Sequence, residues 1–273
     1  MSKVGIVQMR SGRDMTQNLV DATALVREAA SKGATYVLTP EVSNIFEPDK
    51  DRLKAVAMRQ EDDIFVRAFS ALASELGIYL HAGSLALNAG QEKLANRSML
   101  FGPDGLLIAT YDKIHLFDID LPDGESYRES ATYNPGEAAV TVQLPDFKLG
   151  FAICYDMRFP RLANALATAG CSVLTYPAAF TVPTGQAHWH VLLRARAIET
   201  GSFVLSAAQG GVHDSGRATY GHSIAISPWG EVLAELGGEP GVLVVDIDPA
   251  QSVDVRSRIP ALKHAREFAL KQA

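Results

Sequence analysis

The chain has 273 residues, 47% of them hydrophobic and 21% charged, which is ordinary for a globular protein with a sizeable core. Acidic residues outnumber basic ones by 31 to 25 and no basic run occurs, so we expect neither nucleic acid nor an anionic membrane as a partner. The N-terminal segment has no long apolar stretch, and we expect neither a signal peptide nor a membrane span there. Two cysteines are too few for a disulfide scaffold, which favours the reducing cytoplasm.

Hydrophobic periodicity predicts alternating strands and helices in the first half of the chain. The predicted strands are 4–9, 36–39 and 78–83, the predicted helices are 16–32 and 64–76, and a hairpin is predicted over 98–111. The second helix has a capping Asp63 before it and Gly77 at its end. Residues 118–136 are polar and rich in turn formers, which indicates a functional or mobile loop.

The second half continues the same alternation. The predicted strands are 140–144, 147–154, 172–176, 203–208, 223–227 and 242–247, and the predicted helices are 160–169, 187–200 and most of the tail after Pro249. No repeat, linker or change of composition divides the chain. We therefore predict an α/β fold with mixed sheets and a single domain over residues 1–273.

The segment GFAICYDMRFPR, residues 150–161, contains the most informative cysteine. A short apolar run stops at Cys154, and Pro160 stands where a helix can begin. This predicts a sharp strand-to-helix turn, the place where open α/β sheets bind ligands and where one enzyme class exposes a nucleophilic serine. The alternative is a buried structural cysteine, the usual state of a free thiol.

Glu41 and Lys113 share one property with Cys154, because each follows directly on a predicted strand. If these strands are neighbours that run in the same direction, the three side chains meet at one rim. A carboxylate can accept the thiol proton, and an ammonium can stabilise a thiolate or an oxyanion. The alternatives are a solvated acid, a surface cation and a core cysteine.

Other chemistry is less well supported. The seven histidines show no metal-ligand spacing, and we expect no metal site. His115 is interpreted as a packing or supporting residue, and Cys171 as structural. No glycine-rich stretch has the strand–loop–helix context of a phosphate site, and we expect no cofactor.

The chain resembles the carbon–nitrogen hydrolase (nitrilase) superfamily, and within it the Nit-type amidases. The segments that carry the resemblance are VGIVQM, LTPEVSN, YDKIHLFDID, CYDMRFP, LTYPAAF, GQAHWHVLLRARAIET and YGHSIAISPWG. The resemblance implies a four-layer α-β-β-α sandwich with one domain per chain, and a homodimer that extends the sandwich. It also implies that Glu41, Lys113 and Cys154 form the family's triad, with Glu129 of YRES as a second glutamate.

The resemblance implies hydrolysis of a small amide through a thioester. Glu41 would accept the thiol proton of Cys154 during attack on the carbonyl, and would later activate water. Lys113 and the backbone N–H of Tyr155 would hold the oxyanion.

Arg158 lies four residues after Cys154 and suits a substrate carboxylate, unless it forms an ion pair with Asp156 or Glu41. The resemblance implies contact of Arg158 with an α-keto-acid end. Phe180 and Thr184 fall at positions of further pocket contacts, although they could equally be core and turn residues.

The expected substrate is deaminated glutathione, with release of its α-ketoglutarate part. The alternative is ω-amidase action on α-ketoglutaramate or α-ketosuccinamate, and a nitrile is less favoured. Two other classes are a catalytically silent binding subunit and a redox sensor that uses Cys154 and Cys171.

Overall fold

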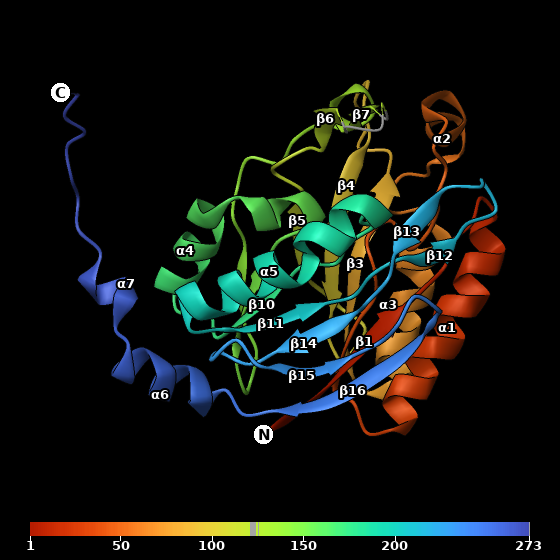
Figure 1. Cartoon of the computed structure of the whole chain (residues 1–273). Helices are drawn as coiled ribbons and strands as arrows, with labels where there is room; N and C mark the ends of the chain where they lie inside the picture. Colours follow the sequence, from red (N-terminus) through yellow and green to blue (C-terminus); the bar gives the residue numbers. More distant parts are fainter. Residues whose placement is uncertain (121–123, 125, 273) are drawn as a thin grey trace.

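The computed structural model describes residues 1–120, 124 and 126–272 of the chain. Two six-stranded sheets stack face to face, and helices cover their outer faces, so that four layers run α-β-β-α across the molecule (Figure 1). The expected four-layer α/β sandwich is confirmed.

The first sheet has the strand order β16-β1-β2-β3-β4-β5 and is mixed. Its strands are β16 (Gly241–Ile247), β1 (Ser2–Gln8), β2 (Tyr36–Leu38), β3 (Tyr79–Leu87), β4 (Ala95–Phe101) and β5 (Leu107–Asp112). β1, β2 and β3 are parallel to one another, whereas β16 and β4 run antiparallel to their neighbours. Helices α1 (Met15–Ser31) and α3 (Ile64–Leu76) pack on its outer face.

The second sheet has the order β15-β14-β11-β10-β9-β8. Its strands are β15 (Val232–Glu235), β14 (Ile224–Ile226), β11 (Phe203–Ser206), β10 (Val173–Thr175), β9 (Lys148–Phe151) and β8 (Thr141–Gln143). Its three central strands are parallel and the others antiparallel. Helices α4 (Pro160–Thr168) and α5 (Val182–Thr200) cover its outer face.

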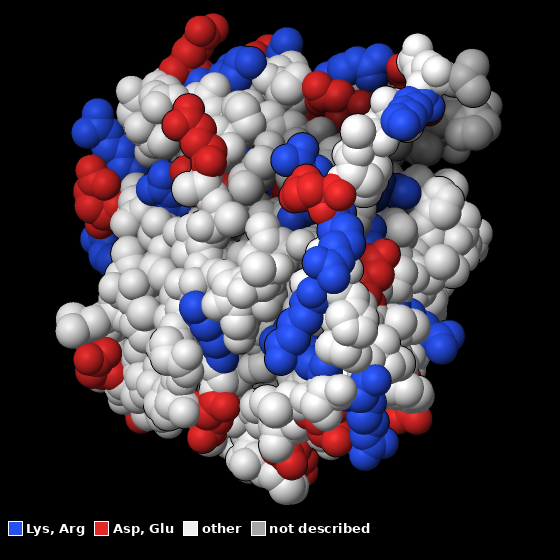
Figure 2. Space-filling model, turned by 90° about the vertical axis from the view of Figure 1, so that its left-hand side faces the viewer, with Lys and Arg blue, Asp and Glu red and all other residues white. Residues whose placement is uncertain are grey.

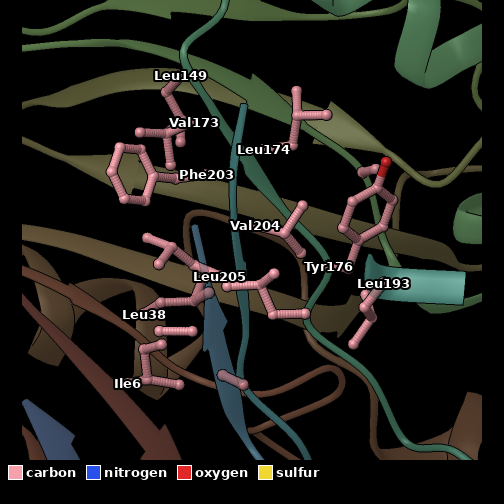
Figure 3. Packing of buried hydrophobic residues seen from close by; sticks show 14 of the residues in the cluster. Ile6, Leu38, Leu149, Val173, Leu174, Tyr176, Leu193, Phe203, Val204 and Leu205 are labelled. Carbon is pink, nitrogen blue, oxygen red and sulfur yellow. The ribbon is translucent and has the colours of Figure 1, made fainter. Parts of the chain in front are cut away.

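The main core fills the space between the sheets. Figure 3 shows Ile6 and Leu38 of the first sheet beside Leu205 of the second, and all three are fully buried. A second cluster, which includes Val26 and Phe69, lies between the first sheet and its helices. Because both faces of each sheet are covered, the central strands are continuous apolar runs.

Local capping signals predict several helix ends correctly. The Asp63 side chain accepts hydrogen bonds from the N–H groups of Phe65 and Val66 at 2.8 and 3.2 Å. Gly77 ends α3 with φ of +64°, and Pro160 occupies the first turn of α4.

Other boundaries differ from the expected ones. α5 begins at Val182 rather than 187, because Pro183 is tolerated in the first turn of a helix. β9 ends at Phe151, since a 3-10 turn begins at Cys154. The tail is helical only in α6 (Ala250–Arg258) and α7 (Ala261–His264).

Short elements form where the sequence shows no clear periodicity. They are α2 (Lys50–Val56) and the hairpins β6 (Asp118–Asp120)–β7 (Ser126–Arg128) and β12 (Gly210–Val212)–β13 (Ala218–Tyr220). The β6–β7 hairpin and the 3-10 turn Glu129–Ala131 occupy the polar 118–136 segment, of which residues 121–123 and 125 lie outside the described ranges.

Charges of both signs are spread over the face of the molecule in Figure 2. A diagonal row of Lys and Arg side chains crosses the middle of this face, with separate Asp and Glu side chains beside it and toward the rim, and broad uncharged areas around it. No helix within the described ranges is long and apolar enough to span a membrane.

Replacing Leu205 by Ala is expected to lower the free energy of unfolding by about 2–5 kcal/mol, because it opens a cavity between the two sheets. Leu270→Ala is the matched control, since Leu270 is 84% exposed, and we expect a change within about 0.5 kcal/mol. Urea titration of both variants measures the difference. Equal stabilities would contradict close packing around Leu205.

Candidate active site

The strands that lead to Glu41, Lys113 and Cys154 are divided between the two sheets. β2 and β5 run in the same direction in the first sheet but are separated by β3 and β4, and β9 belongs to the second sheet. The condition under which the sequence brings the three side chains together, that the strands are neighbours, is therefore not met. Their side chains nevertheless meet, because the ends of β2, β5 and β9 reach the same edge of the stacked sheets.

Lys113, directly after β5, lies at the centre of the cluster. Its side chain is 2% exposed, and its Nζ donates to Glu41 Oε1 at 2.8 Å and to Glu129 Oε2 at 2.9 Å. Burial alone lowers the pKa of Lys113, but the carboxylates of Glu129 and Glu41 outweigh it and hold that pKa well above its ordinary value. The amine is therefore a cation held between two carboxylates.

Further donors fix both glutamates. The backbone N–H of Ala179 donates to Glu41 Oε2 at 2.8 Å, and that of Phe117 donates to Glu129 Oε2 at 2.6 Å. Asn96 of β4 connects the two, because its Nδ2 donates to Oε1 of Glu41 at 2.9 Å and to Oε1 of Glu129 at 3.1 Å. These partners are all N–H donors, which suits an ionised carboxylate.

Cys154 occupies a sharp turn between β9 and α4, as the sequence predicts. Its φ is +47°, a left-handed conformation that few residues other than glycine adopt, and Val42, next to Glu41, has φ of +48°. Such backbone strain persists only where the surrounding structure holds it, and it is common at functional sites.

Asp156 holds the Cys154 turn from within the protein. Its buried carboxylate accepts hydrogen bonds from the Ile153 N–H at 2.8 Å, from the Tyr111 hydroxyl at 2.7 Å and from His115 Nδ1 at 2.7 Å. The His115 ring also stacks on Phe159 with 3.6 Å between ring centroids. His115 therefore supports the turn and packs against it.

Cys154 rests as a thiol. Burial raises the pKa of Cys154 well above the usual thiol range, and the Glu41 carboxylate acts in the same direction. The Lys113 ammonium and the Ala179 N–H oppose this shift without reversing it.

The cluster opens into a cavity of about 540 Å³ whose size is typical of small-molecule sites. The residues predicted from the sequence that line it are Glu41, Lys113, Glu129, Cys154, Phe180 and Thr184. Lining residues that the sequence did not single out include Phe46, Asn96, Phe117, Tyr127, Tyr133 and Arg217. Only Asn96 carries a usable signal, because a polar residue in an otherwise apolar strand is unusual.

Of the predicted substrate contacts, Phe180 and Thr184 line the cavity, whereas Arg158 is not among the described lining residues. Phe180 packs edge to face against Trp189 at 5.1 Å, and Thr184 Oγ1 lies 2.7 Å from Thr181 Oγ1.

The Arg158 guanidinium carbon lies 5.7 Å from the Phe180 ring centre and 5.9 Å from that of Tyr155, and Nη2 lies 3.1 Å from His188 Nδ1. Within the described ranges, no ion pair joins Arg158 to Asp156 or Glu41.

His190, His222 and Glu235 form a separate group whose ligand atoms lie within 4.8 Å of one another. Both imidazoles contact Glu235 Oε1 at 2.8 Å. The sequence did not predict this group because its members come from α5, the segment before β14, and β15.

The two cysteines lie at opposite ends of the β9–β10 pair. Cys171 precedes Val173, which pairs with Leu149, whereas Cys154 follows Phe151. The intervening strand alone spans about 10 Å, more than the 7 Å between Cα atoms that a disulfide tolerates. This separation argues against a redox switch between them.

Comparison with known proteins agrees with this fold. Omega-amidase NIT2 of Danio rerio is 38% identical over 270 residues, covering 97% of this chain and 94% of that protein. Deaminated glutathione amidase of Bos taurus is 38% identical over 269 residues, covering 96% of this chain and 81% of that protein. The NitFhit protein of C. elegans superimposes with a TM-score of 0.90 at 32% identity, and the match covers 97% of this chain and 65% of that one. The carbon–nitrogen hydrolase family model matches residues 3–257, and the chain therefore belongs to this family as a hydrolase of amides.

Proposed function

We propose that the chain hydrolyses amides of α-keto acids through a thioester on Cys154, and that its substrate is deaminated glutathione. The observation that carries the proposal is the buried Lys113 ammonium, which joins Glu41 and Glu129 beside the Cys154 thiol in the cavity. A nucleophile, a proton acceptor and a cation in one desolvated cluster are the groups that acyl transfer needs.

Glu41 is the proton acceptor. As Sγ of Cys154 attacks the amide carbon, the thiol proton passes to Glu41, and the carbonyl oxygen takes the negative charge. The carbon–nitrogen bond then breaks, Glu41 returns the proton to the leaving nitrogen, and a thioester remains. Glu41 next accepts a proton from water, whose oxygen attacks the thioester. The carbon–sulfur bond then breaks, the acid is released, and Glu41 returns the proton to the sulfur of Cys154.

Lys113 and the backbone N–H of Tyr155 stabilise the oxyanion. Tyr155 directly follows Cys154 in the 3-10 turn, the position from which a backbone N–H contributes to the oxyanion hole where a nucleophile sits on a strand-to-helix turn. Glu129 accepts from Lys113 through both carboxylate oxygens at 3.0 and 2.9 Å, and thereby positions the ammonium.

The relatives support amides of α-keto acids, because their names refer to ω-amides and to deaminated glutathione. Deaminated glutathione joins the γ-carbonyl of α-ketoglutarate to cysteinylglycine, whereas α-ketoglutaramate carries a simple amide at the same carbon. The cavity of 540 Å³ favours the larger substrate. ω-Amidase activity is the second candidate, because the omega-amidase relative is equally similar.

Arg158 would bind the carboxylate of the keto acid at the Phe180 wall of the cavity. The presence of Glu41, Lys113 and Cys154 in one cluster argues against a silent binding subunit.

The protein would act as a cytoplasmic homodimer without a metal or cofactor. Exposed apolar side chains gather on one surface, where Ile198 of α5 is 56% exposed, Trp229 54% and Ile259 55%. Clustered exposed apolar side chains of this kind mark interaction surfaces. Light scattering after gel filtration measures the mass, and a monomer at micromolar concentration would rule the dimer out.

The substrate assignment predicts α-ketoglutarate release from deaminated glutathione, with a higher kcat/KM than for α-ketoglutaramate. Cys154→Ala is expected to lower kcat by more than about 10³-fold because it removes the nucleophile. Cys171→Ala is the matched control and should keep the activity, since Cys171 lies at the far end of the strand pair. Preference for α-ketoglutaramate would identify an ω-amidase, and full activity of Cys154→Ala would refute the thioester.

The raised pKa of Cys154 predicts slow alkylation at neutral pH. Because the thiolate forms only above the ordinary thiol range, the rate of reaction with iodoacetamide should rise with pH and show no plateau near neutrality. Glu41→Gln removes a charge that raises this pKa, so the profile should shift to lower pH while turnover is lost. A thiolate that is already formed would make the alkylation rate level off at about pH 6–7, roughly two units below the ordinary pKa of a cysteine thiol. Such a plateau in the unmodified chain would contradict the resting thiol.

A further inference from the structure

Arg217 is a cation of the cavity lining that lies apart from the Lys113 cluster. It lies in the turn between β12 and β13 and lines the cavity. Its guanidinium carbon lies 4.7 Å from the ring centre of Tyr127 and 5.3 Å from that of Phe46. Two aromatic rings therefore hold the planar cation against the cavity wall.

No hydrogen bond from this guanidinium to another described residue is found. Arg217 Nε is buried and has no hydrogen-bond partner, and within the described ranges no carboxylate forms an ion pair with Arg217. A buried donor without a partner is destabilising and rare in native proteins.

The carboxylates that line the cavity have other partners. Glu41 and Glu129 bind Lys113, and Glu47 Oε1 accepts from the backbone N–H of Asp49 at 2.9 Å. The neighbouring cation Arg128 donates to Asp120 at 2.7 Å. Arg217 is thus left to pair with something that enters the cavity.

The turn that carries Arg217 is held rigidly. His213 bonds the Ser11 carbonyl through Nδ1 and the Thr219 hydroxyl through Nε2, both at 2.7 Å. Burial lowers the pKa of His213, so its ring is neutral and does not repel the guanidinium of Arg217. The same ring stacks on Phe46 with 4.0 Å between centroids, so Phe46 is fixed between His213 and Arg217. A pre-organised site loses little entropy on binding.

The ligand chemistry that fits is a carboxylate. The two Nη groups of a guanidinium present donors that match the two oxygens of a carboxylate, and those of Arg217 are the part of the side chain that is not buried. Arg158 lies outside the lining but packs on the lining residue Phe180, whereas Arg217 packs on Phe46, so the two arginines contact different lining residues and can bind two carboxylates of one substrate.

We propose that Arg217 binds a second substrate carboxylate, carried on the amine side of the amide that is cleaved. This inference rests on the proposed function and deepens it. Deaminated glutathione has such a carboxylate at its glycine end, whereas α-ketoglutaramate has none. Arg217 thus makes the enzyme prefer long amides with two carboxylates over short ω-amides.

The first experiment measures binding to the Cys154→Ala chain by calorimetry, with and without Arg217→Gln. The ligands are deaminated glutathione and its analogue with a terminal carboxamide in place of the glycine carboxylate. We expect Arg217→Gln to weaken the binding of deaminated glutathione on the order of 10–100-fold, which is the effect of losing a charged hydrogen-bonded pair. The analogue should bind equally to both chains.

The second experiment measures turnover by chains that keep Cys154. Arg217→Gln should raise KM for deaminated glutathione by a similar factor and leave kcat within about threefold, whereas kcat/KM for α-ketoglutaramate stays within about threefold. Arg67→Gln is the matched control, because Arg67 is exposed on α3 and is not among the residues that line the cavity. It should change KM by less than about threefold.

The outcomes separate the two proposals. An equal loss for both substrates or for the analogue would overturn the role of Arg217, and so would no loss at all. Arg217-dependent binding without hydrolysis by the active chain would refute the proposed reaction on this substrate and leave the carboxylate site intact. Absence of binding to Cys154→Ala would refute both.

Discussion

The burial of the Lys113 ammonium is the constraint on which the site depends. An amine that is 2% exposed stays charged only because Glu41 and Glu129 flank it, and each comes from a different part of the chain. Removal of either carboxylate would leave a buried charge poorly compensated, which is far more destabilising than the loss of a surface pair. The cluster therefore couples the end of β2, the end of β5 and the segment after the β6–β7 hairpin into one unit.

The same cluster sets the state of the nucleophile. Glu41 raises the pKa of Cys154 and also lies where it can accept the thiol proton, so one carboxylate suppresses the free thiolate and assists its formation during attack. The left-handed backbone at Val42 and Cys154 adds strain next to both groups. Asp156, with its donors from Ile153, Tyr111 and His115, stabilises the turn that carries the sulfur.

The parts that were predictable from the sequence are those that depend on neighbouring residues. Asp63, Gly77 and Pro160 act through contacts within a few positions, and the strand-to-helix turn at Cys154 follows from its own segment. Sheet membership depends on pairing between distant segments, which no local pattern contains. The sequence therefore gives Glu41 and Cys154 as residues at strand ends but does not show that β2 and β9 belong to different sheets. Asn96 and Arg217 are missed for the same reason, because each acquires its surroundings only when separate loops meet.

The pairing of β1 with β16 has a consequence for the order of events during synthesis. β1 aligns Ser2 with Ile247, so one edge of β1 has no partner until β16 has been synthesised. Until then its unpaired N–H and C=O groups form an open edge that can recruit strands from other chains. The first sheet, which carries Glu41 and Lys113, is thus completed last, and a truncated chain would expose this edge permanently.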